Sequence, residues 1–108
     1  MEDKEQKTSG NSDTYQWKLG EDLTIYAIES LKESISQELD LHEQFDLDLS
    51  QIEEIDSAGI QLLLALRSEL FRKDKVFKII AMSPVVTKMI ASYELNERLS
   101  VSENADAV

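Results

Sequence analysis

Residues 45–71 constrain the fold of this chain more than any other segment. They begin with FDLDL, in which large apolar side chains alternate with aspartates. This period of two predicts a strand with one buried face and one polar face. A short acidic loop, QIEEI, follows, and then a long apolar stretch that opens with Asp56-Ser57-Ala58-Gly59. The segment therefore predicts a strand, a loop and a helix in succession.

The start of this helix carries the residues of most interest. Asp56 is suited to cap it, because a carboxylate accepts hydrogen bonds from the free N–H groups of a first turn. Ser57 would then be exposed at the positive end of the helix dipole, where an anionic group is favoured. Gly59 lowers helix propensity. A glycine is usually tolerated in a helix because another backbone or a partner approaches closely there. That Ser57 is merely a favourable first-turn residue stays open as the alternative.

The helix itself has a wide apolar face. Its apolar side chains cover an arc of about 200°, whereas a surface helix needs a stripe only somewhat wider than about 100°. We expect most of the arc to pack inside the molecule and the remainder to meet a neighbouring helix or a partner. Arg67 falls within the arc, which indicates that one edge of it is exposed.

The other elements alternate helices with strands. We expect them in this order: strand 15–19, a turn and a returning strand 23–25, helix 28–39, strand 76–81, a helix after Ser83-Pro84, and a last short strand at 99–101. Helices between strands favour parallel pairing, and the polar face of the Asp46/Asp48 strand favours helices on one side. The prediction is an α/β fold: a single small two-layer domain, 15–101, with a central mixed sheet and helices mainly on one face. Residues 1–14 are expected to be a disordered polar tail and 102–108 a flexible one.

Composition narrows the functional class. The 108 residues, 42% of them hydrophobic, suffice for one compact domain, and the absence of cysteine excludes disulfides and thiolate metal sites. With 22 acidic and 11 basic residues the formal net charge is −11. We expect such a chain to lack a basic face and to repel nucleic acid and anionic lipid, so that its partner surface is basic or apolar. No apolar run approaches the ~20 residues that span a bilayer, and no secretory signal is evident. We therefore expect a cytoplasmic protein that is not inserted in a membrane.

Catalytic chemistry finds no support in the sequence. There is no glycine-rich phosphate loop, no metal-ligand spacing and no nucleophile–base pair. The only histidine, His42, is expected on a surface loop. Asp46, Asp48 and Asp56 resemble the strand-end acceptor of a phospho-receiver domain, which also needs an acidic pair and a lysine to hold a cation. Here the acidic pair Glu21-Asp22 falls in a tight turn, and no lysine directly follows the strand that ends at Ala81. We expect no enzyme activity, no catalytic or metal-binding residue and no cofactor.

A family resemblance rests on residues 48–60. They fit D-L-S-x-(I/V)-x-x-I-D-(S/T)-x-G-(I/L), and with the apolar helix that follows they resemble the signature of STAS domains. The resemblance extends from about Trp17 to Val101. The family includes bacterial anti-sigma factor antagonists and small stand-alone relatives found beside chemotaxis and lipid-transport genes. In antagonists the Ser or Thr directly after the Asp, here Ser57, is phosphorylated by a partner kinase. The next position is usually Ser or Thr in antagonists but is Ala58 here. Which branch of the STAS family the chain resembles most is therefore left open.

The resemblance implies a non-enzymatic regulatory module of a bacterial signalling pathway, whose partner binding is switched by phosphorylation of Ser57. The implied partner is an anti-sigma factor with serine-kinase activity or a chemotaxis signalling protein. The expected binding surface consists of Asp56, Ser57, Ala58, Gly59, Gln61 and Leu62. The alternative is an accessory STAS subunit, stably bound without phosphorylation in a larger assembly such as a lipid-transport ABC system. Oligomeric state is left open.

Overall fold

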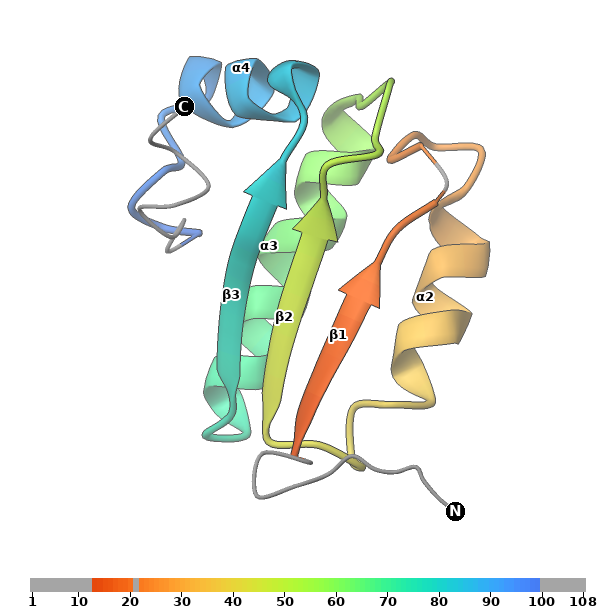
Figure 1. Ribbon diagram of the computed structural model, residues 1–108, viewed down its shortest axis with the longest axis vertical. Coiled ribbons are helices and arrows are strands. Elements are labelled where there is room, and N and C mark those ends of the chain that lie inside the picture. Colours follow the sequence, from red (N-terminus) through yellow and green to blue (C-terminus); the bar gives the residue numbers. More distant parts are fainter. Residues whose placement is uncertain (1–12, 21, 100–108) are drawn as a thin grey trace.

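A computed structural model describes residues 13–20 and 22–99. Its elements follow in the order β1 (Thr14–Lys18), α2 (Ile28–Ser36), β2 (Gln44–Leu49), α3 (Ser57–Arg72), β3 (Val76–Met82) and α4 (Pro84–Ser92). The strands form one sheet in the order β1-β2-β3, and both neighbouring pairs are parallel. In Figure 1, α3 lies behind β2 and β3, α2 lies beside β1, and α4 lies across the carboxyl end of β3. The predicted α/β domain with helices mainly on one face is confirmed.

The returning strand predicted at 23–25 is wrong. Leu23 makes a single parallel bridge to Ile55, after which the chain turns into α2. The backbone N–H of Leu23 donates to the carbonyl oxygen of Glu54, and its own carbonyl accepts from Asp56. Because these groups are taken by the loop after β2, the segment cannot pair with β1. The sheet of the described residues is consequently parallel, where a mixed sheet was predicted.

The ends of the domain lie partly outside the described residues. β1 begins at Thr14, one residue before the predicted boundary, and Leu99 lies in a turn. The rest of the expected strand at 99–101, the tail before residue 13 and the tail 102–108 are outside the described part of the chain.

The core lies between the sheet and the helices. Alternate residues of β2, namely Phe45, Leu47 and Leu49, are fully buried, while Asp46 and Asp48 on the opposite face are half-buried. From α3 the buried apolar residues are Ile60, Leu62, Leu63, Leu66 and Leu70. Most of the wide apolar face of α3 therefore packs inside the molecule, as predicted.

His42 is not a free surface residue. Its ring stacks on Tyr15 with centroids 5.0 Å apart, meets Phe45 edge-on at 5.9 Å, and lies with Nε2 2.9 Å from Glu38 Oε1. The same environment raises the pKa of Tyr15 above its ordinary value, through burial and then through the negative charge of Glu38. His42 packs the loop after α2 against β1, and the sequence expectation missed this because the contacts come from separate elements.

Candidate functional site at the start of α3

The carboxylate of Asp56 joins two segments of the chain. Its Oδ1 accepts a hydrogen bond from the backbone N–H of Gly59 at 3.1 Å, which is the predicted N-cap of α3. Its Oδ2 accepts from the backbone N–H of Ile25 at 3.0 Å. These bonds, that from Ile25 foremost, hold the pKa of Asp56 below its ordinary value. The ionised carboxylate therefore links the helix start to the loop before α2.

A second aspartate, Asp22 in the loop before α2, binds the backbone of the loop after β2. Asp22 Oδ1 accepts from the backbone N–H groups of Glu53 at 2.9 Å and Glu54 at 3.1 Å. Together with the Leu23–Ile55 bridge, these bonds tie the two loops at the carboxyl end of the sheet into one unit. We call this unit, residues 22–26 and 53–57, the rim.

Gly59 is where the two halves of the rim approach most closely. A Cβ placed on this residue would lie 2.2 Å from the carbonyl oxygen of Leu23 and 2.8 Å from its Cβ. Cβ atoms are not found this close to other heavy atoms, so glycine alone fits here. Of the two reasons expected for this glycine, close approach of another backbone is the one that the structure displays.

The six residues expected to bind a partner fall at different depths. Ser57 and Gln61 are exposed and lie one helical turn apart on the same face of α3. Asp56 and Ala58 are half-buried. Gly59 and Leu62 are buried, and Leu62 belongs to the core. Those two residues therefore support the helix from below the surface, where a docked protein would not reach them.

Two exposed apolar residues of the rim were not predicted from the sequence. Ile25 is 60% exposed and Tyr26 is 95% exposed. Tyr26 also borders an open groove of about 720 Å³, whose other lining residues are Gly20, Asp22, Ala27, Ser30, Gln51 and Glu53. A signal was available, since Tyr26 lies off the inner face that Ile28 and Leu31 define for α2.

The rim combines apolar and acidic groups. Around Ile25 and Tyr26 it bears four carboxylates, those of Asp22, Glu53, Glu54 and Asp56. Exposed aromatic side chains commonly anchor protein contacts, and complementary charges around them orient the partner. A partner with an apolar pocket bordered by basic groups would fit this surface.

We also searched the described residues for a metal site and for a membrane-spanning helix. Within residues 13–20 and 22–99, no three histidine or acidic side chains are grouped so that they could hold a metal ion. No helix in the same residues is long and apolar enough to cross a bilayer.

A parallel sheet with helices mainly on one face, together with an aspartate-capped helix that opens on an exposed serine, defines a small two-layer α/β domain. The chain belongs to the STAS-domain family, because the family model described as "Mlab, STAS domain" matches residues 7–102. Domains of this family are generally non-enzymatic modules that mediate protein–protein interaction. A search of curated proteins gave no match.

Proposed function

We propose that the chain is a regulatory module that binds a signalling protein through its rim, and that phosphorylation of Ser57 switches this binding. The observation that carries the proposal is the exposure of Ser57 at the first position of α3, directly after the capping Asp56. Its hydroxyl is accessible to a kinase, and the cap does not depend on it. An anti-sigma factor with serine-kinase activity or a chemotaxis signalling protein is the kind of partner that we propose.

A phosphate on Ser57 would alter binding more than folding. It adds about −1.5 to −2 charges at neutral pH. The amino terminus of α3 favours this charge by up to ~1 kcal/mol, while Glu53, Glu54 and Asp56 oppose it. The two effects act in opposite directions, so we expect little net effect on the fold. In a docked complex, however, the phosphate brings bulk and a desolvated charge into a contact fitted to a hydroxyl, which costs several kcal/mol.

A second candidate function is an accessory STAS subunit, held permanently in a larger assembly such as a lipid-transport ABC system and not phosphorylated. Two observations favour it. The matching family model carries the description Mlab, and Ala58 replaces the second hydroxyl residue of the antagonist pattern. An almost fully exposed Tyr26 would suit a permanent contact as well as a transient one.

Mapping of phosphorylation sites distinguishes the phosphorylation switch from the accessory subunit. Purified wild-type chain, Ser57→Ala and Ser68→Ala are incubated with ATP and an extract of the cells that produce the protein, and are analysed by intact mass and peptide mapping. Ser68 is an exposed serine of the same helix and serves as the matched control. Modification that is lost only in Ser57→Ala supports the switch. Stoichiometric modification elsewhere, with Ser57 untouched, contradicts the switch. Co-purification with a partner at fixed stoichiometry, whatever residue stands at position 57, supports the accessory subunit.

A further inference from the structure

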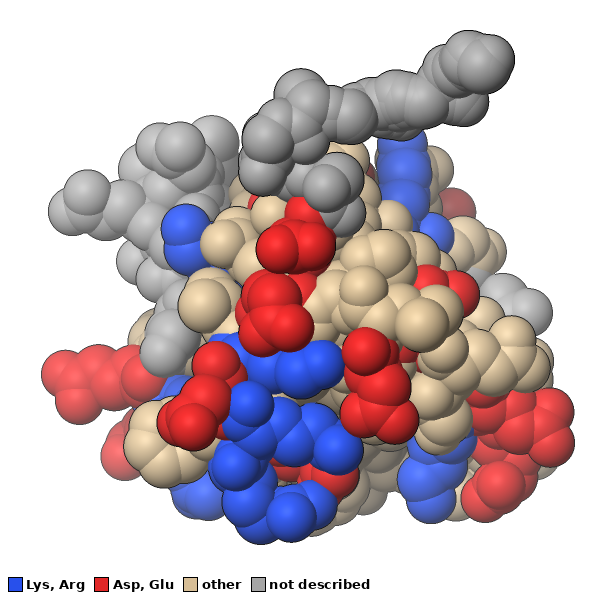
Figure 2. Space-filling model, turned by 90° about the horizontal axis from the view of Figure 1, so that it is seen from below, with Lys and Arg blue, Asp and Glu red and all other residues tan. Residues whose placement is uncertain are grey.

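The opposite end of α3 is basic, although the chain as a whole is strongly acidic. Five of the nine lysines and arginines in the described residues lie between 67 and 78, with only Glu69 and Asp74 as acidic residues in that interval: Arg67, Arg72, Lys73, Lys75 and Lys78. Figure 2 shows basic side chains gathered at this end of the molecule, with acidic ones around them. The expectation that a chain of net charge −11 has no basic face is therefore wrong here.

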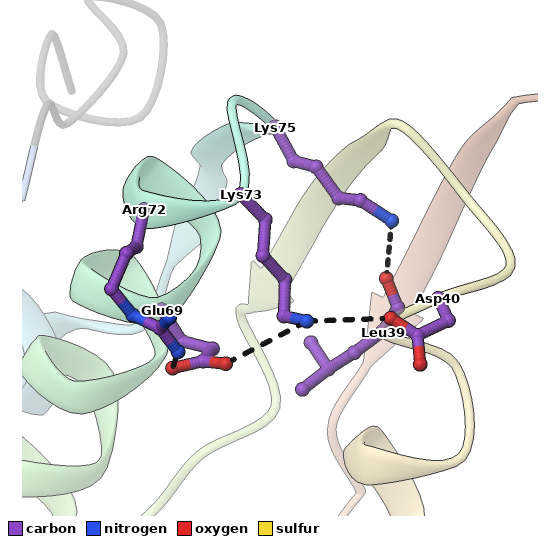
Figure 3. A network of polar contacts seen from close by, with 6 residues as sticks. All are labelled: Leu39, Asp40, Glu69, Arg72, Lys73 and Lys75. Atoms are coloured by element: carbon purple, nitrogen blue, oxygen red, sulfur yellow. Dashed lines mark hydrogen bonds and ion pairs between the residues drawn. The ribbon is translucent and has the colours of Figure 1, made fainter.

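Some of these cations are neutralised within the fold (Figure 3). Arg72 pairs with Glu69, and the Lys73 Nζ lies 3.4 Å from Asp40 Oδ1 and 3.8 Å from Glu69 Oε2. Lys75 differs, because its Nζ donates to the backbone carbonyl oxygen of Leu39 at 2.6 Å. A carbonyl is a neutral acceptor, so this bond fixes the position of Lys75 without cancelling its charge.

Arg67 is also held by a neutral group. Its guanidinium carbon lies 5.8 Å from the ring centroid of Phe71, within the range of a cation–π contact. Phe71 is itself 74% exposed. Arg67, Phe71, Lys75 and Phe77 line an open groove of about 220 Å³, which we call the α3-end groove. The lining thus combines two aromatic side chains with two cations, and the contacts of these cations within the described residues are with uncharged groups.

We infer that the α3-end groove binds an acidic peptide segment of another protein, one that carries an apolar side chain next to its carboxylates. The carboxylates would pair with Arg67, whose planar guanidinium accommodates them in a bidentate manner, and with Lys75. The apolar side chain would cover the exposed ring of Phe71. The chemistry of the groove, cations beside aromatic carbon, is complementary to that combination.

A peptide fits this surface better than an anionic membrane does. Asp40 and Glu69 lie beside Lys73, next to the basic cluster, and the molecule carries a large net negative charge. A bilayer spreads its charge over an area wider than the ~8 Å range of screened electrostatics, so it would meet this repulsion. A single extended segment meets mainly the cations of the groove.

The groove is separate from the rim. Along α3, Arg67 and Phe71 follow Ser57 by ten and fourteen positions, which at about 1.5 Å per residue places them about 15 Å and about 21 Å from it. A partner at the α3-end groove would therefore leave Ser57 accessible, and this inference does not depend on the proposed switch.

The test uses the full chain and a short fluorescein-labelled peptide of glutamates interspersed with leucines, with fluorescence anisotropy as the readout. Wild type should bind it saturably, and Arg67→Glu should weaken binding about tenfold, as expected for the loss and reversal of a close charge pair. Phe71→Ser should weaken it severalfold. Lys88→Glu makes the same kind of charge change on an exposed residue of α4 and should alter affinity less than about twofold. If Arg67→Glu has a markedly lower melting temperature than wild type, the same measurement is made with Lys75→Met, which keeps the aliphatic part of the side chain and removes its charge.

Several results would overturn the inference. Wild type that fails to bind the peptide saturably is one, and equal weakening by Arg67→Glu and Lys88→Glu is another. A peptide with lysines in place of the glutamates should not bind; if it binds as well, the cations are not the determinant. Amide chemical shifts should move at residues 67–78, and shifts confined to the rim would place the peptide elsewhere. Binding to phosphatidylglycerol vesicles without peptide binding would make this end a membrane surface instead.

Discussion

The carbonyl oxygen of Leu23 occupies the space that any side chain on residue 59 would need, since a Cβ there would lie only 2.2 Å away. The same carbonyl accepts a hydrogen bond from the backbone N–H of Asp56. The loop before α2 and the first turn of α3 are thus packed backbone against backbone, and glycine at position 59 is what permits it.

The first prediction concerns this contact. Gly59→Ala should destabilise the fold by about 1–3 kcal/mol or more, because the added Cβ meets backbone that cannot move aside. The melting temperature should fall by about 10 °C, at roughly 4–8 °C per kcal/mol for a domain of this size. Gly20→Ala is the matched control: nothing lies within 4 Å of a Cβ there, so its melting temperature should stay close to that of wild type. Equal melting of the two variants would show that the rim tolerates a side chain at position 59.

The second prediction separates the two hydrogen bonds of Asp56. Asn in this position keeps one acceptor for the N–H of Gly59, but its amide nitrogen cannot accept from Ile25. Ala removes both bonds. We therefore expect melting temperatures in the order wild type, Asp56→Asn, Asp56→Ala, measured by circular dichroism at neutral pH.

The difference in melting temperature between wild type and Asp56→Asn should depend on pH in a definite direction. The pKa of Asp56 is lowered in the folded protein, so its contribution to stability is complete above its unfolded pKa of about 3.9 and is lost as the pH falls through the folded value. The gap in melting temperature between wild type and Asp56→Asn should accordingly be widest near neutral pH and shrink below about pH 4. A gap that widens on acidification would contradict the assigned role of the carboxylate.

The third prediction addresses the proposed switch. Ser57→Asp should leave the melting temperature within a few degrees of wild type, because the gain from the helix dipole offsets repulsion by Glu54 and Asp56. It should nevertheless weaken partner binding by about tenfold to a thousandfold, equivalent to ~1.4–4 kcal/mol. Ser57→Ala should bind as wild type does and lose regulation.

Titration calorimetry with the partner measures this effect, and Ser68→Asp is the control for added charge on the same helix. If wild type, Ser57→Asp and Ser57→Ala bind equally, the rim is not the interface. The accessory-subunit function would then be preferred, provided that the partner still binds at fixed stoichiometry.

The fourth prediction tests the packing around His42. In a Tyr26→Phe/Tyr93→Phe variant, Tyr15 is the one tyrosine that remains of the three. Its absorbance titration should have a midpoint above the ordinary value of about 10, since burial and then Glu38 both raise the pKa. Glu38→Gln should lower that midpoint while leaving it raised, because burial is the larger cause. Since the folded pKa is the higher one, the contribution of Tyr15 to stability should decline as the pH rises past about 10.

Much of this fold was predictable because its signals are local. The alternation in residues 45–49, the capping position of Asp56 and the Ser83-Pro84 helix start each depend on residues close together in sequence. The positions of the three paired strands and of the three helices then followed within a few residues. The exposure of Ser57 was predictable for the same reason, since it directly follows the capping residue and lies off the apolar face of the helix.

What could not be predicted depends on contacts between distant residues. Asp22 looked like a turn residue, yet it bonds to amides 31 and 32 positions away. Leu23 looked like the start of a strand, but its backbone groups bond to the loop after β2. The groove at the far end of α3 brings together Arg67, Lys75 and Phe77 from three consecutive segments, and a net charge of −11 gave no indication of it.

The arrangement of the rim has a consequence for how such a domain can diverge. Asp56 and Gly59 are fixed by the architecture, one by its two hydrogen bonds and the other by the space it leaves. Ser57, between them, satisfies no backbone group and fills no part of the core in the described structure. Mutation can therefore exchange, remove or restore the acceptor at position 57 with little risk to the scaffold, so that descendants of one ancestral domain can gain or lose regulation without passing through an unfolded intermediate.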